Sequence, residues 1–391
     1  MSDRRRYLAA IGIMSLFLIP MLAFLVARHE PPGDLAVYQL AGRMFATGGG
    51  LYNEGWGTSL ASPLPYTYPP LWAAVVVPLA WLPWRVATSF WTLVNLGLLA
   101  WIVDLSYARL IRRFDSRRAI IVATLTVAAA VMAPPTDTFL LGQVGILLTA
   151  ACLADTVPER TRLPRGILVG FSTAVKLTPG IFIPYWAVTR RWRPALTAAA
   201  VAVCLWLLAA LARPELSRQF WTDQVFRNDR VGDASIAIDQ SLRGLLLRTG
   251  WDNAAVWALL AVGIIVVGFR RAARAHVHGD ELAAVTLVGL TGLLVSPVSW
   301  IHHAIWIVPA TGVLLGSGRT RAQWGRWGVV FALFLLRTPQ WVEAGWLPAG
   351  PILTPILENA YVWAYLALVL FLPNDDEARE PVYPSVASVP T

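Results

Sequence analysis

The chain has 391 residues, of which 57% are hydrophobic and 14% are charged. A soluble domain would carry about a quarter charged residues, and several apolar runs here approach the ~20 residues that cross a bilayer. The composition excludes an ordinary soluble domain and predicts an all-α, polytopic membrane protein. The net charge of +9 does not indicate nucleic-acid binding, because Lys176 is the single lysine and the arginines cluster between apolar segments. Membrane lipids with anionic headgroups are the expected partners of such clusters.

The placement of arginine predicts the orientation of the chain in the membrane. Arg4 to Arg6 precede an apolar run at 7–27, which we interpret as an uncleaved first helix with the N-terminus in the cytoplasm. Residues 28–83 then form a first outer loop. The remaining basic clusters, all expected in the cytoplasm, are Arg109–Arg118, Arg160–Arg165, Arg190–Arg193, Arg270–Arg274 and Arg319–Arg326.

Two segments are predicted to be broken. Pro69–Leu82 is too short to span and contains Pro78, so we expect a re-entrant or interfacial helix at the outer surface. With this segment outside, 84–106 crosses inward and the next arginines reach the cytoplasm. The basic flanks of 166–189 require an even number of crossings. Two half-length helices that meet at 176–179 satisfy this requirement, and a single kinked span is the alternative.

The resulting scheme has about twelve crossings, with both termini in the cytoplasm. A seven-helix module at 1–212 is followed by a polar outer loop at 213–252 and a five-helix module at 253–372, and residues 373–391 are predicted to be a disordered tail. The predicted crossings are 7–27, 84–106, 119–133, 140–155, 166–177, 178–189, 194–212, 253–269, 281–298, 302–317, 327–343 and 353–372.

Three polar patches converge on the outer face in this topology. The first, residues 33–53, contains a predicted amphipathic surface helix that is ended by three glycines at 48–50. Asp34 lies at its start and is a candidate catalytic base. A helix N-cap is the competing interpretation of Asp34, and the two roles are compatible. Tyr38, on the same helix, is a candidate substrate ligand.

The second patch is PYTYPPLW, residues 65–72. By residue type, Tyr66 and Tyr68 are typical of the aromatic belt at a membrane interface. The alternative is that they stack on a sugar or guide an acceptor headgroup, which makes both tyrosines candidate substrate ligands.

The third patch joins the 213–252 loop to SPVSWIHH, residues 296–303. His302 and His303 follow Trp300 at the predicted outer end of a helix, where two adjacent histidines are harder to explain as core residues than one. Neighbours on a helix point about 100° apart, so the two histidines form a poor chelating pair. No Cys/His or carboxylate-rich spacing resembles a metal site, and neither a metal nor a cofactor is expected.

Recognition of a lipid phosphate requires fixed cations, and Lys176 and Arg243 are the candidates on the outer side. Gln240, in the same DQSLRGLL stretch as Arg243, is a further candidate for phosphate binding. An ionisable residue in a transmembrane segment indicates function, because its burial is costly. For Lys176 the alternative is that it extends to the lipid headgroups.

Six short stretches occur in an order that resembles glycosyltransferase family 87, within the GT-C superfamily. They cover nearly the whole chain and are GDLAVY, YTYPPL, LGQVGILL, KLTP followed by RRWR, DQSLRGLL and SPVSWIHHAIW. Gly145 and Ile301 depart from the pattern, since the family usually has asparagine and an acidic residue there. The resemblance implies a GT-C fold, with a seven-helix module, outer juxtamembrane helices that carry a catalytic aspartate, and a variable C-terminal module.

The resemblance also implies an α-mannosyltransferase of the plasma membrane with an extracytoplasmic active site. Its donor would be polyprenyl-phosphate mannose, and its acceptor a glycolipid of the phosphatidylinositol mannoside or lipomannan type. Some relatives transfer arabinofuranose from decaprenyl phosphate instead. A lipid or glycolipid transporter is the main alternative of another class, because it shares the helices and the anionic ligand but needs no carboxylate at the outer surface.

The expected mechanism needs a base and positive charge but no general acid, because a sugar phosphodiester already has a good leaving group. Asp34 is the base for the acceptor hydroxyl. Arg243 and Lys176, with one of the two histidines, stabilise the departing lipid phosphate. Direct displacement with a single base predicts inversion, from a β-phosphate donor to an α-linked product. The side chains expected to line the site are Gln143, Gln240 and Trp300.

Overall fold

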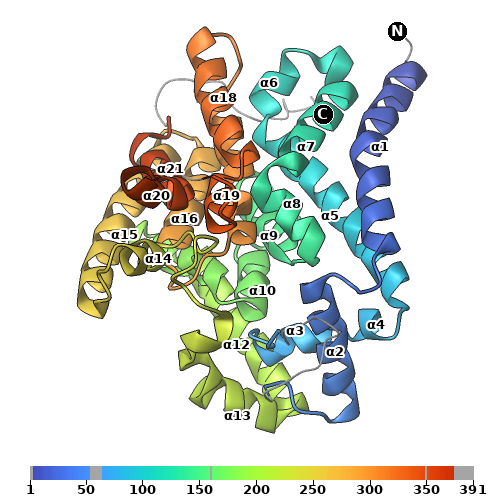
Figure 1. The fold of residues 1–391 in the computed structure, drawn as a ribbon, viewed down its shortest axis with the longest axis vertical. Coiled ribbons are helices and arrows are strands. Elements are labelled where there is room, and N and C mark those ends of the chain that lie inside the picture. Colours follow the sequence, from blue (N-terminus) through green and yellow to red (C-terminus); the bar gives the residue numbers. More distant parts are fainter. Residues whose placement is uncertain (1–2, 53–63, 159–160, 348–349, 374–391) are drawn as a thin grey trace, which may run out of the picture.

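The computed structural model describes residues 3–52, 64–158, 161–347 and 350–373. These residues form the predicted all-α fold (Figure 1), and the only β feature in them is an isolated bridge between Asp239 and Trp300. The predicted disordered tail lies outside the described residues, except for Pro373.

The helices up to residue 212 contain both predicted breaks. They are α1 Asp3–Ala27, α2 Gly33–Thr47, α3 Pro70–Val75, α4 Val77–Ala80, α5 Trp84–Ser106, α6 Ala108–Arg112, α7 Arg118–Val131, α8 Ala133–Leu141, α9 Gly145–Thr156, α10 Ile167–Val175, α11 Phe182–Val188 and α12 Trp192–Ala212. The short 3₁₀ helices η1 Asp115–Arg117 and η2 Thr178–Ile181 lie before α7 and α11.

The second part of the chain begins with short helices in the segment predicted as a polar loop. Its helices are α13 Pro214–Thr222, η3 Gln224–Phe226, η4 Asn228–Val231, α14 Leu242–Arg248, α15 Ala254–Val277, α16 Glu281–Val295, η5 Ile301–Trp306, α17 Ile307–Leu315, α18 Arg321–Leu335, α19 Thr338–Glu343, α20 Gly350–Glu358 and α21 Ala360–Phe371.

Among the described residues, α1, α5, α12 and α15 are long and apolar enough to cross a membrane. Two bent pairs, η1–α7 with α8 (77°) and α20 with α21 (56°), would raise the number to six. Three shorter apolar stretches, α9, α16 and η5–α17, add to the apolar interior. The protein is therefore a multi-pass membrane protein, while the count of about twelve crossings stays a prediction.

Both predicted breaks are present. Val76 separates α3 from α4, so the segment around Pro78 forms two short helices instead of a span. The helix α10 ends at Val175, and Lys176 has an extended backbone with φ −147° and ψ 132°. The turn η2 then begins at Thr178 with a proline in its first turn. Lys176 therefore lies in a gap between two short helices, as the sequence predicts.

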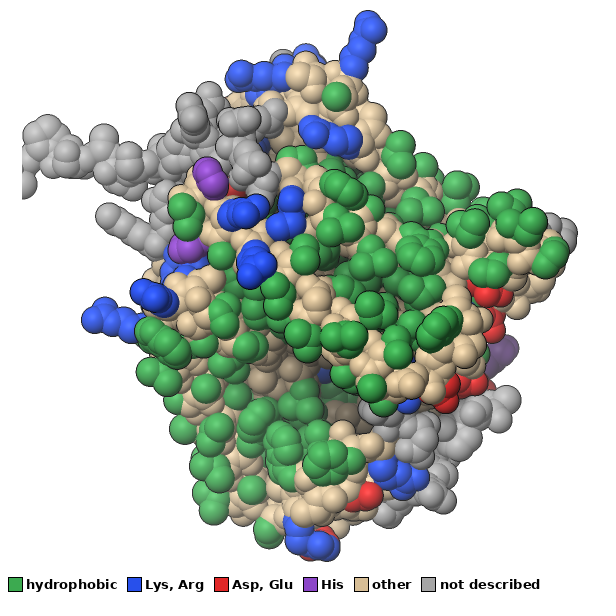
Figure 2. Space-filling view, turned by 90° about the vertical axis from the view of Figure 1, so that its left-hand side faces the viewer, with side chains coloured by type: hydrophobic (Ala, Val, Ile, Leu, Met, Phe, Trp, Pro, Cys, Tyr) green, Lys and Arg blue, Asp and Glu red, His purple; other side chains and the backbone are tan. Residues whose placement is uncertain are grey.

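Figure 1 shows α6 and the beginning of α1, which carry two of the arginine clusters, at the same end of the molecule. Ion pairs and hydrogen bonds join clusters that are distant in sequence: Arg109 to Asp280, Arg113 to the carbonyl of Ser317, and Arg191 to Glu281. Figure 2 shows a broad area of hydrophobic side chains over the middle of one face, with most of its arginines towards the upper end. These contacts bring basic clusters together in the fold, as the positive-inside tendency predicts.

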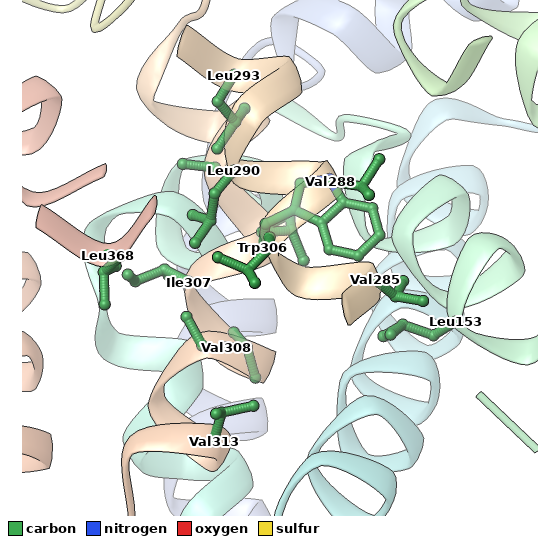
Figure 3. Packing of buried hydrophobic residues seen from close by; sticks show 14 of the residues in the cluster. Leu153, Val285, Val288, Leu290, Leu293, Trp306, Ile307, Val308, Val313 and Leu368 are labelled. Carbon is green, nitrogen blue, oxygen red and sulfur yellow. The ribbon is translucent and has the colours of Figure 1, made fainter. Parts of the chain in front are cut away.

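The core supports the segment that carries the two histidines. The indole of Trp306, at the end of η5, packs among residues of α16 that include Val288 and Leu290 (Figure 3). Gly289 provides the space, because a Cβ at this position would lie 2.1 Å from the Trp306 ring. The C-terminal end of η5, at Trp306, is thereby held against α16.

Glycines also allow α10 to approach α12 closely. Gly166 has a positive φ of 103°, and a Cβ there would lie 2.4 Å from the carbonyl oxygen of Pro194. A Cβ at Gly170 would lie 2.6 Å from the carbonyl oxygen of Ala198. Small residues four apart let membrane helices pack with their backbones in near contact. This packing fixes the helix whose last turn leads into Lys176.

We expect Gly170→Ala to destabilise the protein, because its Cβ would meet the backbone of α12. The free energy of unfolding should fall by about 1–3 kcal/mol, measured as a lower Tm in detergent. Gly97→Ala on α5 is the matched control, since nothing lies within 4 Å of a Cβ there. Helix propensity alone should stabilise that variant by up to about 1 kcal/mol. Equal Tm values for the two variants would contradict the close packing of α10 and α12.

Candidate active site

Asp34 lies in the first turn of α2, where the helix dipole favours a carboxylate. The N-cap is Pro32, which has no side-chain cap bond, so the competing interpretation of Asp34 as the N-cap is wrong. Burial raises the pKa of Asp34 to about 6, while Gln143 and Lys176 favour the ionised form and lower it. A carboxylate with a pKa near neutrality can accept a proton and release it again.

The helix α2 is fixed by side chains that reach backbone carbonyls. Gln39 donates to the carbonyl oxygen of Leu79 in the last turn of α4 (2.9 Å) and to that of Leu82 just beyond α4 (3.0 Å). At the other end of α2, Arg213 donates to the carbonyls of Met44, Phe45 and Gly49 at 3.1, 2.5 and 2.8 Å. Arg213 follows α12 directly, and no motif in the sequence indicates this role for it. It ties the helix that carries Asp34 to a membrane-spanning helix.

Gln143 is oriented by two tyrosine hydroxyls. Its side-chain oxygen accepts from Tyr38 (3.1 Å) and from Tyr68 (3.0 Å), whose hydroxyls are also 2.8 Å apart. Because its oxygen is engaged in this way, the amide nitrogen is left to stabilise the carboxylate of Asp34. Gly142 makes the approach possible, with a positive φ of 72° and a Cβ position 2.6 Å from Leu35 of α2.

Lys176 and His303 form the second half of the cluster. The Lys176 ammonium lies 2.8 Å from Nε2 of His303 and 5.3 Å from the centre of the Tyr68 ring. It also interacts electrostatically with Asp34. The rings of His302 and His303 are perpendicular, with centroids 4.6 Å apart, and Nε2 of His302 is buried without a hydrogen-bond partner among the described residues. Lys176 therefore contacts groups inside the protein, which the alternative of extension to the lipid headgroups does not explain.

Tyr66 and Tyr68 are buried within an aromatic cluster that also contains Tyr52. The Tyr66 hydroxyl donates to the carbonyl of Pro69 (3.0 Å), and the Tyr52 hydroxyl donates to the carbonyl of Tyr68 (2.9 Å). No motif in the sequence indicates this role for Tyr52. These contacts hold the loop before α3 in shape, so the structure gives Tyr66 a packing role and places only Tyr68 against Lys176.

The predicted phosphate ligand Gln240 has another role in the structure. Its side-chain nitrogen donates to the carbonyls of Ala237 and Glu358, and its oxygen accepts from the backbone nitrogens of Tyr361 and Val362. All its hydrogen-bonding capacity is used in joining the loop before α14 to the start of α21. A phosphate contact would require one of these bonds to break, and the role proposed for Gln240 stays a prediction.

Arg243 and Trp300 contact other parts of the protein. Arg243, on α14, lines a separate cavity of about 30 Å³ with Trp251 and Trp257. Trp300 packs on Gly232, where a Cβ would lie 2.8 Å from the indole. The roles proposed for these two residues stay predictions.

A cavity of about 60 Å³ adjoins the cluster and is lined by Lys176 and His303 together with Ser296 and Ser299. This volume holds only a few water molecules. Gly145 also lines it, and a Cβ at Gly145 would lie 3.2 Å from the carbonyl oxygen of His302. No group of three or more His, Cys, Asp or Glu side chains in the described part of the chain is arranged to hold a metal ion.

This constellation joins a carboxylate, an ammonium and two imidazoles from segments far apart in the chain, beside a wall of tyrosines. Such a site can accept a proton from a hydroxyl and stabilise a leaving phosphate, which is the chemistry of transfer from a phosphate-linked donor.

Comparison with known proteins agrees with this chemistry. The sequence model of glycosyltransferase family 87 matches residues 66–297, more than half of the chain. The polyprenol-phosphate-mannose-dependent alpha-(1-2)-phosphatidylinositol mannoside mannosyltransferase of Mycobacterium tuberculosis is 34% identical over 367 residues, 86% of this chain and 83% of that protein. The protein of the same name from Mycolicibacterium smegmatis is 33% identical over 74% of this chain and 71% of its own length.

A polyprenol-phosphate-mannose-dependent alpha-(1-2)-phosphatidylinositol pentamannoside mannosyltransferase of Mycolicibacterium smegmatis is 32% identical over 78% of this chain and 75% of its own length. No solved structure matches the chain. Because the family match covers more than half of the sequence and the relatives align over most of their length, the chain belongs to glycosyltransferase family 87 and is a glycosyltransferase.

Proposed function

We propose that this protein transfers a mannosyl residue from polyprenyl-phosphate mannose to a glycolipid acceptor of the phosphatidylinositol mannoside class, with an α-linked product. The names of its relatives support this donor and acceptor. The observation that carries the proposal is the meeting of Asp34 with Lys176 and His303 at one site.

In the proposed reaction the acceptor hydroxyl attacks the anomeric carbon of the donor sugar. A new carbon–oxygen bond forms as the bond to the phosphate oxygen breaks, and polyprenyl phosphate leaves with the electron pair. Asp34 takes the proton of the attacking hydroxyl. Because the site offers one carboxylate and direct displacement, the configuration inverts from a β-phosphate donor to an α-linked product.

Lys176 is the cation proposed for the departing phosphate. Its ammonium and the neighbouring His303 can both donate charge-assisted hydrogen bonds, which are stronger than those between neutral groups. Arg243 lines a different cavity, so its proposed contact with the donor depends on how the lipid phosphate lies in the complex. His302, whose Nε2 has no hydrogen-bond partner among the residues that the structure describes, is a second candidate donor.

The active site is proposed to face the outside of the plasma membrane. Support comes from arginine-rich segments: α6 and the start of α1 lie at one end of the molecule, and Arg109 and Arg113 of the α6 region contact Asp280 and Ser317. Arginine-rich loops are retained in the cytoplasm. α2 and α3 lie towards the opposite end of the molecule (Figure 1), where a lipid donor in the outer leaflet can reach Asp34.

The proposal can be tested with purified protein in detergent, supplied with labelled donors and a glycolipid extract. Mannosylated lipid should form from polyprenyl-phosphate mannose. Product from decaprenyl-phosphate arabinofuranose alone would identify an arabinosyltransferase instead. Absence of product from both donors, with folded protein, would favour a transporter, because micelles offer no membrane to cross.

Asp34→Asn is expected to reduce the rate of transfer by about 10²–10⁴-fold, because the amide cannot take the proton of the acceptor hydroxyl. The rate is measured as labelled glycolipid per unit time. Asp223→Asn, an exposed aspartate in the segment after α13, is the matched control and should retain the wild-type rate. Near-normal turnover by Asp34→Asn would remove Asp34 from the chemistry.

The pH dependence of kcat/KM should report the ionisation of Asp34. Since the active form is the carboxylate, activity should rise with pH through a midpoint near pH 6, the pKa that burial produces. Gln143→Leu removes a group that favours the ionised form of Asp34. The pKa of Asp34 should therefore rise, and the acidic limb of the pH–activity profile should move to higher pH. The variant should therefore lose more activity at pH 6 than at pH 8. An unchanged limb in Gln143→Leu would show that Gln143 does not stabilise the base.

A further inference from the structure

An ion pair that the proposed reaction does not use joins two short helices. Asp137 lies on α8, and Arg337 directly precedes α19, which lies beside α8 (Figure 1). The Arg337 guanidinium donates to Oδ1 of Asp137, and Gln340 donates to Oδ2 at 3.2 Å. The paired side chains are only 28% and 17% exposed. Charged groups enclosed in this way in the apolar part of a membrane protein indicate function.

Arg337 makes this contact from a strained backbone conformation. Its φ of 51° and ψ of 36° lie in the left-handed region, which disfavours residues other than glycine. In the described ranges, Arg190 is the one other non-glycine residue with a positive φ. Such conformations persist where the surrounding structure enforces them, and they cluster at functional sites. The ion pair with Asp137 is a contact that this conformation provides.

The residue after Asp137 contacts both halves of the active site. The carbonyl oxygen of Thr138 accepts from the backbone nitrogen of Gln143 (3.0 Å), and its hydroxyl donates to the carbonyl oxygen of His302 (3.3 Å). The orientation of α8 therefore sets the position of Gln143, which follows the helix directly. The side chain of Gln143 in turn favours the ionised form of Asp34.

We propose that Arg337 is a positioning residue of the active site: its ion pair with Asp137 fixes the orientation of α8 and thereby holds Gln143 against Asp34. This inference rests on the proposed function, in which Asp34 is the base. Arg337 acts on the base through α8 and is not a ligand of the substrate. The segment between α18 and α19 contributes in this way to a carboxylate that lies in the first turn of α2.

The sign of a pKa shift separates this role from a direct effect of charge. The titratable groups that interact electrostatically with Asp34 include Lys176, Tyr38 and Tyr68. Through space, loss of the cation in Arg337→Gln would raise the pKa of Asp34, whereas loss of the anion in Asp137→Asn would lower it. Loss of the positioning contact instead releases Gln143 in both variants, so the pKa of Asp34 rises in both.

The pH dependence of kcat/KM, measured on purified full-length protein, tests this distinction. Arg337→Gln and Asp137→Asn should both move the acidic limb to higher pH. Both should also lower kcat at pH 7 by about 10–100-fold, since a displacement of ~1 Å at the reacting groups can cost that much. Arg337→Lys, which keeps the charge but loses the planar fork of donors, should lie between these variants and the wild type.

The double variant Arg337→Gln/Asp137→Asn should lose no more activity than either single variant, because each substitution removes the same contact. Opposite shifts of the acidic limb in the two single variants would overturn the proposal and indicate a direct effect of charge. Additive losses in the double variant would also overturn it.

Hydrogen exchange provides a readout that does not depend on the reaction. In Arg337→Gln the amide of Gln143 should exchange faster than in the wild type. Arg118→Gln, which removes the ion pair with Asp104 at the first residue of α7, is the matched control and should leave this exchange and the activity unchanged. The Tm of every variant is measured, so that misfolding is recognised.

The two readouts distinguish failure of this inference from failure of the proposed function. Unchanged exchange at Gln143 in Arg337→Gln, with Asp34→Asn inactive, would overturn the positioning role alone. Faster exchange at Gln143, with normal turnover by Asp34→Asn, would remove Asp34 as the base and support the contact through α8.

Discussion

The buried ammonium of Lys176 is the constraint on which the site depends. Removing an isolated ammonium from water costs several kcal/mol, and three segments supply the partners that offset this cost. His303 comes from η5, the face of the Tyr68 ring from the loop before α3, and the carboxylate of Asp34 from α2. Because α10 ends at Val175, the lysine leaves the helix in an extended conformation and can reach all of them.

The helix α12 couples the two halves of this arrangement. Along its length it packs on α10, whose Gly166 and Gly170 bring the backbones together. Directly after its end, Arg213 holds the carbonyls at the C-terminus of α2. One rigid span thus positions both the helix that leads to Lys176 and the helix that begins at Asp34. A site on rigid elements holds its charged groups in fixed positions, which electrostatic stabilisation of a leaving group requires.

The two ends of the protein have different electrostatic character. At one end, arginines from distant loops pair with Asp280 and Glu281. At the other, a small number of charges is enclosed by tyrosines and apolar helices. The asymmetry matches a protein that holds its orientation through one set of charges and performs chemistry with another.

The sequence by itself determined the class of this protein, the spans α5 and α12, and the breaks, whereas α15 continues to Val277 through the Arg270–Arg274 cluster, beyond the predicted crossing at 253–269. The ends of α5 and α12 and the gap at Lys176 follow from the lengths of apolar runs and from prolines, which act locally. The ordered motifs also identified Asp34, Lys176 and the two histidines as candidates. Only the tertiary structure decided how side chains pair. Gln143 meets Tyr38 across 105 residues, and Gln240, similar in type, binds backbone groups 118 and more residues away. Such pairing depends on how helices pack, because a hydrogen bond between distant segments leaves no periodic pattern in either of them.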